Sequence, residues 1–233
     1  TTSGTVEFMA RVEVTYGGVT VNTDEGAVTF SGNVYIYDGD LSVTTGLGDV
    51  TFLQTVDAGI SAVSITTGGG SVLFDGPIQC AESGVSLTTA GAGTVHFTDT
   101  GSINTDGGFL SVTTAGGSAT FDAGITTDGG AVTLATNGGD VTFDALAPIG
   151  TSGGALSVTT AGGDADFGAE IDTDTGTITV STGDGSAIFR DGVYSWDSGG
   201  GGGADITITT GAGDVTFLDD LDAYDDAYDD AEL

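Results

Sequence analysis

The sequence predicts an all-β fold, a parallel β-helix (β-solenoid) with three short strands in each coil of about 22 residues. Apolar residues return at a nearly constant step along the chain, which is the pattern of a tandem repeat. Ten of the eleven Phe residues fall at one position of this repeat, and Phe109 is the exception. Apolar residues also alternate with small polar ones over short stretches bounded by Gly and Asp, which favours strands over helices.

Three columns of apolar residues define the three strands of each coil. The first column comprises Val21, Val43, Ile65, Leu87, Val112, Leu134, Val158, Val180 and Ile208. The second comprises Phe8, Phe30, Phe52, Phe74, Phe97, Phe121, Phe143, Phe167, Phe189 and Phe217. The third comprises Val12, Val34, Val56, Ile78, Ile103, Ile125, Ile149, Ile171, Val193 and Leu221. Because one coil cannot bury its own inward face, we expect nine full coils and a partial N-terminal coil to stack at about 4.8 Å, right-handed by the crossover rule.

The repeat covers residues 1–221, which we expect to form a single solenoid domain. From the third column to the next first column the step is nine residues in the other coils. Between Val193 and Ile208 it is fifteen, so residues 194–205 are predicted to hold a long Gly-rich insertion.

The two ends of the repeat are predicted to be interaction sites, because an uncapped solenoid end exposes strand edges and core. In the acidic tail, residues 222–233, Tyr224 and Tyr228 follow Leu221 at helical spacing. We therefore expect a short capping or docking helix, a frayed tail, or an arm that reaches another subunit. Either the chain is a slice of a longer repeat protein, or copies stack head to tail into a homopolymer. The residues expected at such contacts are Thr5, Val6, Phe8, Phe217, Leu221, Tyr224 and Tyr228.

Composition excludes several classes of partner. The chain has 34 acidic and two basic residues and a formal charge of −32, so it has no basic patch with which to bind nucleic acid or an anionic membrane. No apolar run of about 18 residues is present, so we expect no membrane span. Cys80 is the single cysteine, which excludes a disulfide within the chain, and its position predicts a buried side chain.

Catalytic motifs are largely missing from the sequence. Asn-Thr-Asp at 22–24 and at 104–106 is similar to one motif of polygalacturonases, but the other motifs of that family are not present. Nucleophile-elbow, phosphate-loop and zinc-site spacings are also missing. We therefore expect a protein that is not an enzyme and that requires no cofactor.

Asp-rich turns leave calcium binding open, because carboxylates and carbonyls are the ligands that calcium prefers. The alternative is that these Asp residues only stabilise their own turns. The candidate ligands are Asp38, Asp40, Asp172, Asp174, Asp219, Asp220 and Asp222.

Ser and Thr flank the first column on the outward side of the predicted strands. The outward threonines are Thr44, Thr66, Thr88, Thr113, Thr159 and Thr209. This Thr-x-Thr ladder resembles the ice-binding faces of β-helical antifreeze proteins, which implies an ice- or carbohydrate-binding face as the alternative function. Thr also has a high strand propensity and suits any solvated sheet.

The units TTGLGDVTF, TTGGGSVLF, TTAGGDADF and TTGAGDVTF recur in tandem. In this style of repeat the chain resembles the repeat regions of giant secreted bacterial adhesins of the filamentous-haemagglutinin type. The resemblance implies an extracellular or cell-surface location and a part in adhesion or in a surface or matrix fibre. The sequence thus predicts a non-enzymatic structural protein whose partner is itself or a continuation of the same repeat.

Overall fold

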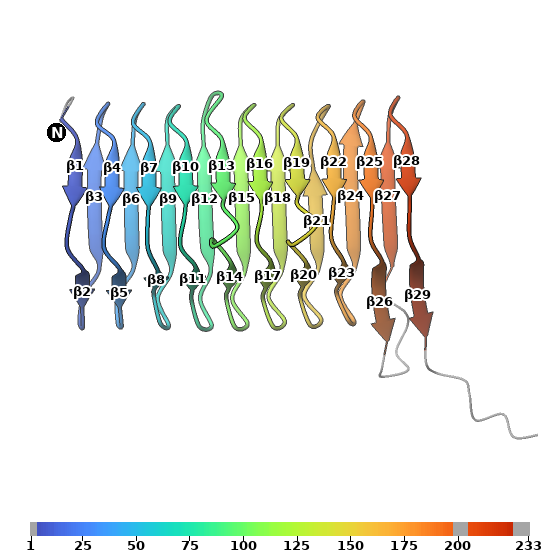
Figure 1. Cartoon of the computed structure of the whole chain (residues 1–233), viewed down its shortest axis with the longest axis horizontal. Helices are drawn as coiled ribbons and strands as arrows, with labels where there is room; N and C mark the ends of the chain where they lie inside the picture. The colour runs from blue at the N-terminus through green and yellow to red at the C-terminus, as the bar shows by residue number, and fades with distance from the viewer. Residues whose placement is uncertain (1–3, 198–204, 226–233) are drawn as a thin grey trace, which may run out of the picture.

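The computed structural model describes residues 4–197 and 205–225. Figure 1 shows a rod of stacked coils in which three parallel sheets run side by side along the long axis. Each of the nine full coils contributes one strand to each sheet, and the described residues contain no helix. The structure therefore confirms the predicted β-solenoid of about nine coils with three strands per coil.

The sheets are named here after their contents. The Phe sheet consists of β1 (Val6–Phe8), β4 (Val28–Phe30), β7 (Val50–Phe52), β10 (Val72–Phe74), β13 (Val95–Phe97), β16 (Ala119–Phe121), β19 (Val141–Phe143), β22 (Ala165–Phe167), β25 (Ala187–Phe189) and β28 (Val215–Phe217). The third sheet consists of β2 (Val12–Val14), β5 (Val34–Ile36), β8 (Val56–Asp57), β11 (Ile78–Gln79), β14 (Ile103–Asn104), β17 (Ile125–Thr126), β20 (Ile149–Gly150), β23 (Ile171–Asp172), β26 (Val193–Asp197) and β29 (Leu221–Asp225). The hydroxyl sheet consists of β3 (Val19–Thr23), β6 (Leu41–Thr45), β9 (Val63–Thr67), β12 (Val85–Thr89), β15 (Leu110–Thr114), β18 (Val132–Thr136), β21 (Leu156–Thr159), β24 (Ile178–Gly183) and β27 (Ile206–Thr210).

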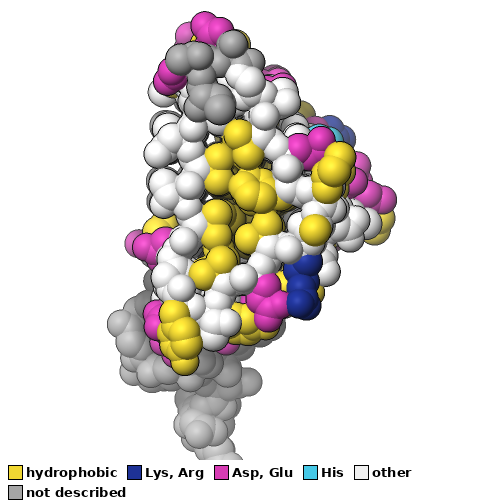
Figure 2. All heavy atoms as spheres, turned by 90° about the vertical axis from the view of Figure 1, so that its left-hand side faces the viewer, with side chains coloured by type: hydrophobic (Ala, Val, Ile, Leu, Met, Phe, Trp, Pro, Cys, Tyr) yellow, Lys and Arg dark blue, Asp and Glu magenta, His cyan; other side chains and the backbone are white. Residues whose placement is uncertain are grey.

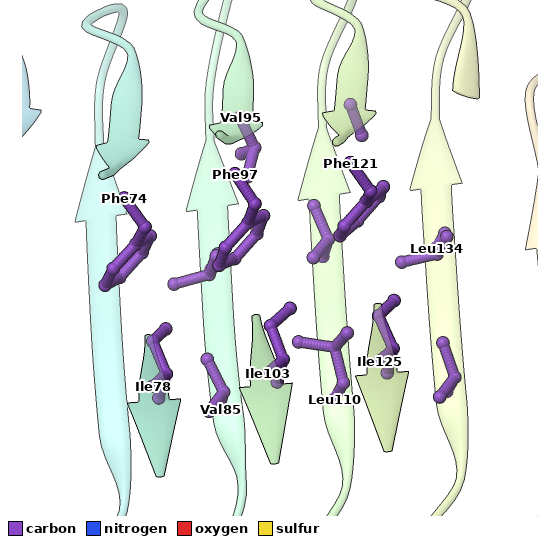
Figure 3. Close-up of a cluster of buried hydrophobic side chains, with 14 of the residues drawn as sticks. Phe74, Ile78, Val85, Val95, Phe97, Ile103, Leu110, Phe121, Ile125 and Leu134 are labelled. Carbon is purple, nitrogen blue, oxygen red and sulfur yellow. The ribbon is translucent and has the colours of Figure 1, made fainter. Parts of the chain in front are cut away.

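The core is a set of ladders in which each apolar residue packs on its equivalents in the neighbouring coils. All ten column phenylalanines are stacked, with ring centroids 4.6–5.4 Å apart and ring planes within 10° of parallel. Figure 3 shows Phe74, Phe97 and Phe121 in one such row, above a row of isoleucines from the third sheet. Strand pairing keeps every Phe opposite a Phe, because the period of the sequence equals the length of one coil.

A second, polar ladder closes the turn between the hydroxyl sheet and the Phe sheet. In each coil a Thr at the end of the hydroxyl strand, or directly after it, is turned inward and its Oγ1 donates a hydrogen bond to a Gly carbonyl. Thr45 Oγ1, for example, lies 2.5 Å from the carbonyl oxygen of Gly48. The residues that do this are Thr23, Thr45, Thr67, Thr89, Thr114, Thr136, Thr160, Thr182 and Thr210. The second Thr of each such "TT" pair is therefore turned inward, fully buried in the inner coils and partly buried at Thr210, whereas the first faces outward.

The glycines of these turns are required by close contact between coils. A Cβ at Gly48 would lie 2.1 Å from the carbonyl oxygen of Gly26, and a Cβ at Gly139 would lie 2.2 Å from that of Gly117. Such distances are shorter than any van der Waals contact, so glycine at this position allows the coils to stack at strand spacing.

The described part of the C-terminal tail, residues 222–225, does not form the helix that was one of the alternatives considered for residues 222–233. Leu221–Asp225 is a strand, β29, that pairs in parallel with all five residues of β26. Pairing with the preceding coil satisfies the backbone groups on the inner edge of β29, and this gain outweighs the helical spacing of Leu221 and Tyr224. β26 continues to Asp197, so the first four residues of the segment 194–205 belong to a strand. Tyr228 and the remainder of the tail lie outside the described residues.

Candidate functional site

The N-terminal end of the rod exposes the start of each inward ladder. Val6, Phe8, Val12 and Val19 pack against the core on one side and are only partly buried. Figure 2 views this end of the rod and shows hydrophobic side chains gathered at the centre of the end face, with acidic side chains nearer its rim. Thr5, which precedes the first strand, is exposed. The predicted N-terminal contact residues therefore do lie together on one apolar end surface.

The C-terminal end presents the same three ladders. Phe217 is partly buried, whereas its neighbours in the ladder, such as Phe189, are fully buried. Val215 and Leu221 remain 43% and 48% exposed. Tyr224 lies on β29, beside the backbone of Trp196. Each end of the described rod thus carries apolar surface at the positions where a further coil would bury it.

Among the described residues, the strands at the two ends of the rod also have one edge that no other strand pairs with. β1 and β28 are the outermost strands of the Phe sheet, β2 and β29 those of the third sheet, and β3 and β27 those of the hydroxyl sheet. An edge strand presents backbone N–H and C=O groups that another parallel strand can pair with. The pairing is directional: Val6 N–H donates to the Ala27 carbonyl, and Ser31 N–H donates to the Phe8 carbonyl. A coil added at either end would find this same alternation of donors and acceptors.

The outward face of the hydroxyl sheet is flat and uncharged. The six predicted threonines face outward, and Thr44, Thr66, Thr88 and Thr113 stand opposite one another in four successive coils. Ala135 then interrupts this row. None of the outward positions on the described strands of this sheet carries a charge, although the chain has 34 acidic residues. The acidic side chains are thereby restricted to the other faces and the turns.

The Asp residues considered for calcium are engaged in local structure or exposed. Asp40 Oδ1 accepts a hydrogen bond from the Ala62 N–H of the next coil at 3.0 Å, and Asp172 Oδ1 accepts one from Asp174 N–H at 3.0 Å. Within the described part of the chain, no group of three or more His, Cys, Asp or Glu side chains is arranged to hold a metal ion. The remaining candidates lie at exposed positions: Asp38, Asp219, Asp220 and Asp222.

The side chains of His96 and Cys80 could in principle take part in catalysis, but their contacts are those of structural residues. His96 lies on the outer face of the Phe sheet, where its Nε2 is 2.7 Å from Asp122 Oδ2 of the next coil. Cys80 is buried as predicted, and burial, reinforced by the negative charge of Asp57, raises the pKa of its thiol to about 12. A thiol with this pKa stays protonated at neutral pH and is a poor nucleophile.

An ion pair between coils was not predicted from the sequence. The Arg190 guanidinium donates two parallel hydrogen bonds to the Asp166 carboxylate, at 2.8 and 2.7 Å. The two residues are 24 apart in the chain, slightly more than one coil, and the only sequence signal is their separation by about one repeat. This pair links successive coils across the outside of the Phe sheet.

Comparison of the chain with protein-family models, with curated proteins and with solved structures finds no match. None of the described residues belongs to a helix long and apolar enough to cross a membrane. The candidate functional site is therefore defined by the structure itself, as the two apolar end faces and their strand edges.

Proposed function

We propose that this chain is a non-enzymatic structural element of an extracellular filament or adhesive fibre, in which further parallel coils continue the solenoid at its ends. The observation that carries this proposal is the correspondence of the two end faces. Phe8 at one end and Phe217 at the other belong to the same ladder, and both remain partly exposed. A second copy stacked in register would bury each against the other.

The match extends to the neighbouring ladders. Val6 and Val215 occupy equivalent positions two residues before these phenylalanines, and Val12 and Leu221 start equivalent strands of the third sheet. Apolar burial at about 25 cal/mol per Å2 and restored backbone pairing both favour such a contact. A head-to-tail contact that does not close on itself produces an open filament.

The charge distribution favours growth along the axis over lateral clumping. With a net charge of −32, the sides of two rods repel each other at low ionic strength, whereas the centre of the end face is apolar. Divalent cations such as calcium would weaken this repulsion and allow neighbouring rods to associate. A secreted, surface-attached location follows from the resemblance to adhesin repeats.

Electron microscopy and sedimentation of the purified chain, with and without calcium, test the proposal. We expect rods of uniform width that lengthen with protein concentration. Phe217→Asp should shorten them by placing a carboxylate in the contact. Phe109→Asp is the matched control, because Phe109 is 48% exposed and lies outside the stacked column. Single-length particles under all conditions, or equal effects of the two substitutions, would overturn the proposal.

The uncharged hydroxyl face supports a second candidate function, binding to ice or to a crystalline carbohydrate surface. Its parallel rows of Ser and Thr form a regular array without charge. Thermal hysteresis and ice shaping measure the first activity, and sedimentation with insoluble polysaccharide measures the second. Thr88→Lys should abolish either one, whereas Thr120→Lys, on the outer face of the Phe sheet, should not. If the unmodified chain shows neither activity, this candidate is rejected.

A further inference from the structure

One phenylalanine lies outside the core, on the outer side of the hydroxyl sheet. Phe109 directly precedes Leu110, the buried first residue of β15, so strand alternation turns the Phe109 side chain outward. Phe109 is 48% exposed, whereas the phenylalanines of the stacked column from Phe30 to Phe189 are buried. This ring therefore lies on the same outer surface as the rows of Ser and Thr.

The ring lies flat on the backbone of Gly84, the equivalent residue of the preceding coil. Val85 of β12 pairs with Leu110, and Val85 N–H donates to the Phe109 carbonyl, so Gly84 and Phe109 are neighbours in adjacent coils. A Cβ at Gly84 would lie 2.5, 2.5 and 2.7 Å from the Cδ1, Cε1 and Cγ atoms of Phe109. Because these distances are nearly equal, a face of the ring covers Gly84, and not its edge. Gly84 is accordingly buried, and the opposite face of the ring is turned to solvent.

The ring, and not the stacking of coils, requires glycine at position 84. The three atoms nearest to a Cβ at Gly84 all belong to Phe109, and no backbone atom is among them. Alanine occupies the equivalent position in three other coils, as Ala62, Ala131 and Ala155, so the stack accepts a Cβ there. Gly84 and Phe109 therefore form one unit, in which the glycine allows the ring to lie flat on the sheet.

Hydroxyl groups lie beside this ring. The outward residues two positions farther along β12 and β15 are Ser86 and Ser111, about 6.8 Å from Gly84 and Phe109 along the strands. The next outward residue on both strands is a threonine. The surface around Phe109 thus combines one apolar ring face with hydroxyl donors and acceptors, and the outward positions of these two strands carry no charge.

We infer that Phe109 and the hydroxyls beside it form a binding subsite for a neutral polysaccharide. A pyranose ring has a face of C–H bonds, which packs on the electron-rich face of an aromatic ring. It also has hydroxyls at its edge, which exchange hydrogen bonds with Ser and Thr. The inference rests on the second candidate function and deepens it. It selects carbohydrate over ice, because the apolar ring interrupts the regular hydroxyl array that ice would match.

Charge favours a neutral chain over an anionic one and over a second copy of the protein. Glu82 and Asp106 are exposed in the turns that lead into β12 and β15, and the net charge is −32, so a polymer of uronates would be repelled. Face-to-face contact between two copies would bring the acidic turns of both to the rim of one contact. A neutral polysaccharide meets neither source of repulsion.

Binding of the full chain to immobilised polysaccharides tests the inference. The probes are beads coated with cellulose or mannan, which are neutral, or with polygalacturonate, which is anionic, and bound protein is measured over a range of protein concentrations. Phe109→Leu removes the ring but keeps an apolar side chain, and Phe109→Trp keeps a ring. Leu146→Ala is the matched control, because Leu146 is also an exposed apolar residue but lies in a turn outside the hydroxyl sheet.

We expect the unmodified chain to bind cellulose or mannan and not polygalacturonate. Phe109→Leu should weaken this binding about tenfold, whereas Phe109→Trp and Leu146→Ala should retain it within about threefold. Binding by Phe109→Leu equal to that of the unmodified chain would overturn the subsite but leave the hydroxyl face as a binding surface. If the unmodified chain binds neither neutral polymer, the subsite and the carbohydrate candidate both fail.

Electron microscopy of the same variants separates this inference from the proposed filament. Rod length and width should be the same for all four proteins, because Phe109 lies outside the end faces. A change in either dimension with Phe109→Leu would show that a second copy covers the ring, and would overturn the subsite. Absence of rods in every variant, with polysaccharide binding intact, would overturn the filament alone.

Discussion

Replacement of Thr45 by Val removes one rung of the buried Thr–Gly ladder at nearly constant side-chain volume. Thr45 is 2% exposed, and its hydroxyl is the donor that the structure gives to the carbonyl oxygen of Gly48. Gly48 is itself buried, so water cannot replace the lost donor. The substitution therefore removes a hydrogen bond and leaves a buried acceptor unpaired, which costs about 1–3 kcal/mol of folding free energy.

The matched control for Thr45 is its neighbour, Thr44. Thr44 faces outward on the same strand, so Thr44→Val should change the stability by no more than about 0.5 kcal/mol. Urea unfolding followed by circular dichroism measures both values, and hydrogen exchange near Gly48 shows whether the loss is local. Equal effects of the two substitutions, or a Thr45→Val variant as stable as the parent, would refute the role assigned to the buried hydroxyl.

Three further predictions follow from the same coil geometry and charge. Gly139→Ala should destabilise the rod more than Gly138→Ala, because a Cβ at Gly139 would lie 2.2 Å from the Gly117 carbonyl oxygen. A Cβ at Gly138 has no atom within 4 Å, so Gly138→Ala costs only the backbone strain of a φ of +100°. Equal losses of stability in urea unfolding would contradict this. Burial raises the pKa of Cys80 to about 12, so the unfolded state loses its proton first and stability should fall as pH rises from about 9 to 12. Cys80→Ala should make that slope shallower, and an unchanged slope would contradict the prediction. Because the net charge is −32, the acidic side chains repel one another and destabilise the folded rod at low salt. The thermal unfolding midpoint should therefore rise as NaCl shortens the Debye length from about 30 Å at 0.01 M to about 3 Å at 1 M. A midpoint that does not change with salt would show that self-repulsion is unimportant.

Much of the architecture was predictable because, in a tandem repeat, residues one period apart in the sequence become neighbours in space. Once Phe97 and Phe121 are seen to occupy the same position of successive coils, their stacking follows from the parallel register. The inward position of Cys80 followed from strand alternation in the same way. The strand bounds were predicted less well after Val193 and after Leu221, where the regular spacing of the repeat is interrupted or ends. The continuation of β26 to Asp197 and of β29 to Asp225 depends on the two segments pairing with each other, which their own sequences do not indicate.

The sequence by itself determined the coil, its three strands and the residues that face inward, because these depend on periods of about 22 and two along one chain. Only the tertiary structure decided the roles of residues whose environment is set by contacts between neighbouring coils. The second Thr of each pair is turned inward because a Gly carbonyl lies within reach of its hydroxyl, and that Gly is needed because the next coil is only one strand spacing away.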